Sequence, residues 1–259
     1  MGLAMSNYST IRCRELKDVL IIQLYRPEAN NSLNVLLIGE LRSALQKAEE
    51  NESIKVVVLE GLPDNFCTGM DFQAVNGGED AFSQDDPNGY YEVLKFFSCC
   101  SKVIISKVEG KVNAGGIGLV AASDIVIADE KANFGLSEAL FGLLPACVMP
   151  FLIRRTGYQK ALWMTLTTQG IPASRAYQIG LVDEVSTNVS DAVRKNLLRL
   201  TRLETGTIRE LKEYMAELWI MDESTQRLAV NRITSLVQSE KVRHNIRNFV
   251  NNGKFPWDK

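Results

Sequence analysis

The segment from Lys102 to Asp129 restricts the possible folds more than any other part of the sequence. It runs from an apolar stretch, KVIISKV, through a glycine stretch, NAGGIGLV (Asn113 to Val120), into a second apolar stretch, DIVIAD. Apolar runs of this kind are typical of buried strands, and the few residues between them leave room only for a short helix. Strands joined through a helix predict an α/β fold with crossover connections.

The rest of the first half repeats this alternation. DVLIIQLYRP (18–27) reads as a strand ended by proline, residues 34–51 carry apolar side chains at helical spacing, and IKVVVLEG (54–61) is another strand. The segment from Gly77 to Tyr90 is rich in Gly, Asp, Asn and Ser, which predicts a surface loop. A helix is predicted to follow it over residues 91–101.

From Pro150 onward the pattern becomes almost entirely helical. Helices are predicted over residues 151–168, 172–180, 190–203, 207–219 and 224–247. The chain is therefore expected to consist of an α/β core, residues 1–195, and a C-terminal helical region, residues 196–259.

Composition excludes several classes of function. A net charge of −2 gives no basic surface for nucleic acid or an anionic membrane, and no apolar stretch approaches the roughly 20 residues of a membrane span. The five cysteines are scattered without metal-ligand spacing, so we expect no metal site and reduced thiols in a cytoplasmic protein. The single histidine, His244, lies in a basic C-terminal stretch, which makes a Ser-His-Asp triad improbable and an exposed position the expectation.

The glycine stretch fits backbone hydrogen bonding better than nucleotide binding. Gly116, Gly118 and Ala121 match the dinucleotide fingerprint, but the next strand starts too early and its acid, Asp129, comes too soon. A strand that ends in glycines and opens a helix exposes N–H groups, which stabilise negative charge on a carbonyl oxygen. The stretch NFCTGMDF follows strand 54–61 in the same way, with Gly69 permitting an unusual backbone angle.

Four segments in this order resemble the crotonase superfamily, the enoyl-CoA hydratases and isomerases: LYRPEANNSLN, VVVLEGLPDNFCTGMDF, GKVNAGGIGLVAASDIVIADEKANFGLSEALFGLLPA and ASRAYQIGLVDEV. The resemblance implies a spiral of stacked ββα units with a helical trimerisation region, assembled as trimers or dimers of trimers. It also implies that the N–H groups of Met70 and Gly115 polarise the carbonyl of an acyl thioester.

The catalytic carboxylates depart from the usual family pattern. Ordinary hydratases carry two glutamates; Glu138 matches one of them, and Gly118 stands at the position of the other. The family's PGAGG stretch is replaced by LPACVMPFLIRR (144–155). We expect Glu138 to act alone, first as the base at the α-carbon and then as the acid for the departing hydroxyl, with its pKa raised by partial burial.

The departures resemble one subgroup, the first enoyl-hydratase-like enzyme of polyketide β-branching cassettes. This resemblance implies dehydration of 3-hydroxy-3-methylglutaryl thioester to 3-methylglutaconyl thioester, carried on the phosphopantetheine of an acyl carrier protein and without another cofactor. Three alternatives remain: the decarboxylase of the same pathway, a general enoyl-CoA hydratase, and an inactive scaffold. Glu138 weighs against the first and third, and Gly118 against the second.

Further residues are expected to shape the substrate site. Asn113 and Cys147 are candidates for orienting the hydroxyl, and Arg26 and Lys254 for meeting the carrier. Lys107, Arg154 and Arg155 are weak candidates for the distal carboxylate of the substrate, each favoured as a structural ion-pair partner. The residues expected to bind the substrate are Gly69, Asp71, Asn113, Gly116, Cys147 and Arg26.

Overall fold

The computed structural model describes residues 8–73, 85–219 and 222–258. Its larger sheet has six strands in the order β1-β2-β3-β5-β7-β10, in which β1 and β2 are antiparallel and the other neighbours are parallel. These strands are β1 (Ile11–Leu16), β2 (Val19–Leu24), β3 (Val56–Glu60), β5 (Val103–Val108), β7 (Ile125–Asp129) and β10 (Glu184–Ser186). The predicted parallel α/β organisation is confirmed.

A second, smaller sheet has the order β4-β6-β8-β9. Its strands are β4 (Asn65–Cys67), β6 (Lys111–Asn113), β8 (Asn133–Gly135) and β9 (Ile171–Pro172). The chain supplies one strand to the large sheet and the next to the small sheet, in the pairs β3/β4, β5/β6 and β7/β8, and this gives the expected spiral. The sequence analysis did not identify the strands of the small sheet, because two or three residues are too few to show an alternating pattern.

Helices follow or cover these strand pairs. They are α1 (Val35–Glu50), α3 (Asp85–Cys99), α4 (Gly115–Ala122), α5 (Met149–Thr156), α6 (Tyr158–Thr167), α7 (Ala173–Gln178), α8 (Val189–Leu200), α9 (Thr205–Leu218), α10 (Glu223–Gln238) and α11 (Glu240–Asn252), with 3₁₀ turns η1 (Pro27–Ala29) and η2 (Glu138–Phe141). Within the described ranges, no helix combines the length and the apolar character that crossing a membrane requires.

Three boundaries differ from the predictions. Residues 85–90, expected in a loop, form the first turns of α3, while residues 77–84 lie outside the described part of the chain. The helix expected over 151–168 is two helices, because Gly157 between them has a φ of 77°. The helix expected over 224–247 breaks at Ser239, which has extended backbone angles.

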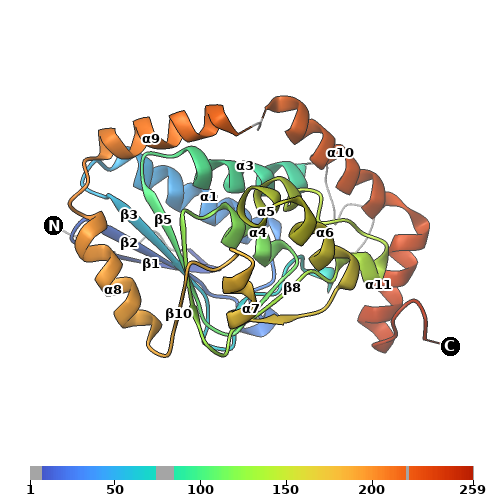
Figure 1. The fold of residues 1–259 in the computed structure, drawn as a ribbon. Coiled ribbons are helices and arrows are strands. Elements are labelled where there is room, and N and C mark those ends of the chain that lie inside the picture. The colour runs from blue at the N-terminus through green and yellow to red at the C-terminus, as the bar shows by residue number, and fades with distance from the viewer. Residues whose placement is uncertain (1–7, 74–84, 220–221, 259) are drawn as a thin grey trace.

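Both faces of the large sheet are covered. Val56, Val58 and Ile105 pack on one face with Val189 and Val193 of α8. The residues that alternate with them in the same strands belong to a second buried cluster, which also contains apolar side chains of α1 and α3. Figure 1 shows α8 apart from α1, with the strands between them. Burial on both faces explains why the strands read as continuous apolar runs. The expected domain boundary after Lys195 falls inside α8.

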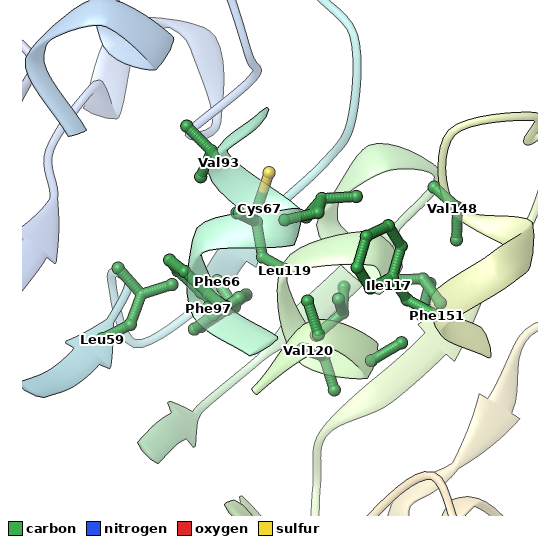
Figure 2. Close-up of a cluster of buried hydrophobic side chains, with 14 of the residues drawn as sticks. Leu59, Phe66, Cys67, Val93, Phe97, Ile117, Leu119, Val120, Val148 and Phe151 are labelled. Carbon is green, nitrogen blue, oxygen red and sulfur yellow. The ribbon is translucent and has the colours of Figure 1, made fainter. Parts of the chain in front are cut away.

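Helix α4 lies at the centre of the core. All its residues from Gly116 to Ala122 are buried, so it is apolar all round. Figure 2 shows Ile117, Leu119 and Val120 of this helix among apolar side chains of the surrounding elements, with Phe97 of α3 close by. This packing fixes the first turn of α4, which contains the glycines that follow β6.

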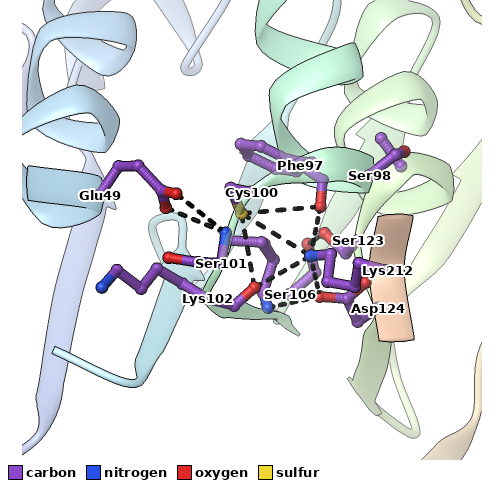
Figure 3. A network of polar contacts seen from close by, with 12 residues as sticks. Glu49, Phe97, Ser98, Cys100, Ser101, Lys102, Ser106, Ser123, Asp124 and Lys212 are labelled. Atoms are coloured by element: carbon purple, nitrogen blue, oxygen red, sulfur yellow. Dashed lines mark hydrogen bonds and ion pairs between the residues drawn. The ribbon is translucent and has the colours of Figure 1, made fainter. Parts of the chain in front are cut away.

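A buried polar cluster attaches α9 to the core. Lys212 is 8% exposed, and its Nζ donates to the carbonyls of Phe97 (2.7 Å) and Lys102 (2.9 Å). The same ammonium pairs with Asp124 at 2.7 Å, and Asp124 accepts a hydrogen bond from the N–H of Ile104. Figure 3 shows these groups converging on Lys212. The C-terminal helices are thereby joined to β5 and to the end of α3.

Candidate active site

A cavity of about 420 Å³ opens beside the first turn of α4. It is lined by six parts of the chain: the start of α1, the turn at Met70–Phe72, α3, the segment from Asn113 to Gly115, the segment from η2 to Val148, and the C-terminal helices. Phe255, in the KFPW tail, also lines it and lies against Phe141 and Phe249. The walls are mainly apolar, with polar side chains concentrated near α4 and η2, as expected of a small-molecule site.

Two backbone N–H groups face this cavity from different strand ends. Gly115 is the first residue of α4, where an N–H has no partner within the helix. At the other strand end, Leu33 donates to the carbonyl of Gly69 and accepts from the N–H of Asp71, so the N–H of Met70 points away from Leu33. Met70 and Gly115 both line the cavity, and together they can hold a carbonyl oxygen.

Glycine is required where these two strand ends meet. Gly69 has a φ of 91°, and a Cβ there would come within 2.5 Å of the Ala114 Cβ and 3.2 Å of the Gly115 nitrogen. A Cβ on Gly116 would overlap the carbonyl of Cys67. Gly69 and Gly116 therefore bring the two donors together. Their predicted direct contact with substrate stays a prediction.

Ala114 holds a conformation that residues with a side chain rarely adopt. Its φ is 49° and its ψ is −121°, and it is the residue that precedes the first turn of α4. Backbone of this kind costs about 1–3 kcal/mol and is found preferentially at functional sites. The strain lies immediately before the Gly115 N–H and sets the direction of that donor.

Glu138 faces the same cavity from the first residue of η2. Its Oε2 is buried and has no hydrogen-bond partner among the described residues. Burial raises the pKa of Glu138 to about 7, against the lowering effect of the N–H groups of Glu138 and Ser137. A carboxyl group that is unpaired and near neutrality can take up and release a proton at working pH. The expected raised pKa is confirmed.

Asn113 and Cys147 are both placed at the cavity, as predicted from the sequence. The side-chain amide of Asn113 donates to Ser137 Oγ at 2.8 Å, so it holds the residue before Glu138. Cys147 donates weakly to the Pro87 carbonyl, and burial raises the pKa of its thiol to about 12. The thiol is therefore neutral and is no source of protons near pH 7.

Arg26 and Asp71 form an ion pair beside the donor turn. The guanidinium of Arg26 lies 2.9 Å from Asp71 Oδ2 and donates to the Ser32 carbonyl at 2.6 Å, with its side chain only 11% exposed. Asp71 lines the cavity. This pair fixes the residue that follows Met70. The predicted substrate contact of Arg26 stays a prediction, since the described cavity lining does not include it.

The position of the missing second carboxylate is filled by a residue that the sequence analysis did not identify. A Cβ on Gly118 would overlap the hydroxyl oxygen of Tyr90 and would lie 3.1 Å from Leu94 and from Val148. The Tyr90 hydroxyl donates to the carbonyl of Gly115 and lines the cavity. No motif marks Tyr90, because its place depends on how α3 packs on α4.

Three cations considered for the distal carboxylate lie elsewhere. Lys107 pairs with Glu60 (3.3 Å) and Glu109 (3.0 Å). Arg154 donates to the carbonyls of Ala121 and Ala122, and Arg155 pairs with Asp183. The favoured role as a structural ion-pair partner is confirmed for Lys107 and Arg155. Arg154 is also held structurally, but by backbone carbonyls, and no ion pair of Arg154 is found among the described residues. Among the described lining residues none is Lys or Arg.

The exposed groups agree with the sequence analysis. His244 is exposed and contacts Asn248, as expected of a surface residue. The five cysteines are free, which agrees with the predicted reduced thiols. Lys254 is exposed next to Phe255, at the end of the chain that reaches the cavity.

Comparison with known proteins places this fold and site in a class. The family described as enoyl-CoA hydratase/isomerase matches residues 14–259, and the chain belongs to that family. It is an enzyme, a lyase of the hydratase/dehydratase type.

Individual relatives agree with this assignment. The chain is 42% identical to the bacillaene synthase dehydratase PksH of Bacillus subtilis, over 97% of both chains. A crystal structure described as a putative polyketide biosynthesis enoyl-CoA hydratase (pksH) from Bacillus subtilis superposes with a TM-score of 0.89, covering 96% of this chain and all of the other. A probable enoyl-CoA hydratase of Rhizobium meliloti is 31% identical over 69% of each chain.

Proposed function

We propose that this enzyme dehydrates 3-hydroxy-3-methylglutaryl thioester, carried on an acyl carrier protein, to 3-methylglutaconyl thioester during polyketide β-branching. The observation that supports the proposal is a cavity lined by Met70, Gly115 and the buried carboxyl group of Glu138, together with a glycine, Gly118, at the position where the resemblance places a second glutamate in hydratases. Similarity to the bacillaene synthase dehydratase supports the polyketide setting.

The chemistry suits a single carboxyl group. The α-proton of a thioester is weakly acidic, so the N–H groups of Met70 and Gly115 stabilise the enolate as Glu138 removes that proton. Loss of hydroxyl from a tertiary carbon places some positive character there, which lowers the demand for a strong acid. Glu138 then returns the proton to the departing hydroxyl if both groups leave from one face.

The diacid and its carrier are accommodated in different ways. Since the described cavity lining holds no Lys or Arg, we expect the distal carboxylate to meet neutral donors such as Asn113 and Ser137. For the carrier, Lys254 is the better placed of the two predicted cations, because it is exposed whereas the Arg26 side chain is only 11% exposed. An exposed cation at the cavity end fits an acidic carrier surface.

The decisive experiment is a dehydration assay with the purified protein. Carrier-bound 3-hydroxy-3-methylglutaryl thioester is incubated with enzyme, and the carrier is analysed by mass spectrometry. Loss of one water is the expected result. Loss of carbon dioxide from carrier-bound 3-methylglutaconyl thioester would indicate the decarboxylase instead, faster hydration of a straight-chain enoyl-CoA would indicate a general hydratase, and no turnover would indicate a scaffold.

We also propose that the enzyme assembles as a trimer or a dimer of trimers. Helix α9 exposes Leu211, Tyr214, Met215 and Leu218, and α10 exposes Leu228, each by more than half. Apolar side chains gathered on neighbouring helices are typical of an interface between subunits. The mass measured by light scattering during gel filtration tests this, and a monomer would contradict it.

A further inference from the structure

Gly118 and Tyr90 are complementary in shape. Gly118 lies in α4, and any side chain there would collide with the Tyr90 hydroxyl, which reaches across from α3. Leu94 and Val148 close the remaining space around Gly118. The site has therefore not simply lost a carboxylate at position 118. A phenol from another helix occupies the volume into which that carboxylate would project.

We propose that Tyr90 replaces the second catalytic carboxylate, donating a hydrogen bond to the β-hydroxyl of the bound thioester and directing that hydroxyl towards Glu138. The proposal rests on the hydratase/dehydratase activity of the family, and not on the identity of the acyl group. Tyr90 lines the cavity with Glu138 and Gly115, so its hydroxyl can reach a group bound between them.

The hydroxyl of Tyr90 is able to change partners. In the unliganded site it donates to the carbonyl of Gly115. That carbonyl lies in the first turn of α4, where helix geometry also gives it the N–H of residue 119 as a donor. The Tyr90 O–H can therefore turn to the substrate oxygen without leaving the Gly115 carbonyl unpaired.

A neutral donor suits this position better than an acid. Burial raises the pKa of Tyr90 well above its usual value, and a negative charge on Glu138 acts in the same direction. Tyr90 thus keeps its proton throughout the reaction. A second carboxylate here would repel that of Glu138, whereas a phenol adds a hydrogen bond without adding charge.

The proposed step balances with these two residues. The carboxylate of Glu138 takes the α-proton, and the electron pair of that C–H bond forms the α,β double bond. The β-carbon–oxygen bond breaks, and the oxygen leaves as water after receiving the proton held by Glu138. Tyr90 stabilises the departing oxygen by its hydrogen bond and neither gains nor loses a proton.

The test compares two reactions in Tyr90→Phe, which keeps the ring and removes the hydroxyl. One is dehydration of 3-hydroxy-3-methylglutaryl thioester. The other is exchange of α-protons with D₂O in 3-methylglutaryl thioester, which lacks the β-hydroxyl. We expect dehydration to fall about 10- to 100-fold, while α-proton exchange stays within about threefold of wild type.

Two results would overturn the proposal. An equal fall in both reactions would mean that Tyr90 acts only by holding Gly115 and its N–H. No fall in either would mean that the hydroxyl is idle. Tyr91→Phe is the matched control, since Tyr91 is the neighbouring buried tyrosine of α3 and is not among the described residues that line the cavity; both reactions should be unchanged.

Failure of the proposed substrate is distinguishable from failure of this inference. If the wild-type enzyme does not dehydrate 3-hydroxy-3-methylglutaryl thioester, the comparison is made with the β-hydroxyacyl thioester that it does dehydrate, and with the analogue of that thioester lacking the hydroxyl. The expected selective loss in Tyr90→Phe is the same.

Discussion

Two ionisable side chains whose charged groups are buried, Lys212 and Glu138, differ in how fully those groups are hydrogen-bonded. Lys212 has its ammonium satisfied by two carbonyls and by the carboxylate of Asp124. Glu138 has an oxygen, Oε2, that is buried without a hydrogen-bond partner among the described residues. A buried charge with every hydrogen bond made contributes to structure, whereas an unsatisfied one is free to react.

The difference follows from where each residue lies. Lys212 is on α9, whose apolar face packs on the core, and its ammonium ends beside the carbonyls at the end of α3 and the start of β5. Glu138 begins a short 3₁₀ turn at the edge of a cavity, with the substrate volume in front of it. In the proposed reaction, the bound substrate supplies the partner that Glu138 lacks.

The largest expected effect is on the rate of Glu138→Gln. The amide keeps the shape of the side chain and removes both its basicity and its acidity, so dehydration of the carrier-bound substrate should fall by about 10³-fold. The initial rate, measured by mass spectrometry of the carrier, checks this. A rate within about tenfold of wild type would mean that another base acts.

The matched control is Glu130→Gln, which changes an exposed glutamate after β7. Its dehydration rate should equal that of wild type. Glu138→Gln should also fold, with a melting temperature no lower than that of wild type, because no hydrogen bond to Oε2 is lost. Unfolding of Glu138→Gln would place Glu138 with Lys212 as a structural residue and remove the contrast between them.

The next largest effect is on the stability of Lys212→Met. This change keeps the length of the side chain but leaves the Asp124 carboxylate and two carbonyls without their donor, which should cost about 3–5 kcal/mol of unfolding free energy. Urea denaturation measures the loss. Dehydration per folded molecule should remain near that of wild type.

Lys195→Met is the control for this variant. Lys195 is an exposed lysine of α8 that pairs with Asp191 on the same helix, and such pairs contribute little. Its unfolding free energy should change by less than about 0.5 kcal/mol. A similar loss in both lysine variants would show that the Lys212 cluster has no special role.

The pH dependence of stability gives a third, smaller difference. The Glu138 pKa is raised from 4.5 to about 7 in the folded state, so above pH 7 the folded protein carries a charge whose burial opposes folding. That cost, about 3 kcal/mol at most, is fully present above pH 7 and disappears as the pH falls to 4.5. Glu138→Gln should therefore be more stable than wild type at pH 8 and equally stable near pH 4.5. Equal stability at pH 8 would contradict the raised pKa.

The same pKa sets the acid limb of the rate. Glu138 must be ionised to take the α-proton, so the rate should fall about tenfold for each pH unit below its pKa. Tyr90 contributes no alkaline limb near neutrality, because its pKa is raised well above the usual value.

The sequence was sufficient for parts of the site that are continuous in the chain. Glycines at the end of a strand and before a helix indicate exposed N–H groups, and the family motif locates Glu138. Tyr90 was missed because its role depends on the packing of α3 against α4, which no short pattern records. The same reason applies to Lys212, which reads as an ordinary helix charge until Asp124 is brought beside it.

Arg26 is a residue that a sequence motif identifies but whose contacts the sequence does not reveal. Its motif predicts a contact with the carrier or the thioester arm, but the sequence does not show that Asp71 and the Ser32 carbonyl already occupy its guanidinium. Likewise, the composition of residues 77–90 predicted a loop, whereas packing against the core keeps residues from Pro87 onward helical. Local patterns locate a residue, and its partners decide its role.

The smallest effect is expected for Ala114→Gly. This variant tests whether the backbone beside Glu138 and the cavity is strained. Ala114 has a φ of 49° and a ψ of −121°, a conformation that glycine adopts without strain. Relief of about 1–3 kcal/mol of strain exceeds the extra chain entropy of glycine, about 0.5–1 kcal/mol, so the variant should be about 1 kcal/mol more stable. Ala216→Gly, in the last turn of α9, should instead lose stability, by up to about 1 kcal/mol. Opposite shifts in the two melting temperatures are the expected result. A loss of stability in both variants would mean that the Ala114 conformation is not strained. The burial of the Glu138 carboxyl would then be the remaining feature of the active site that lowers the free energy of unfolding.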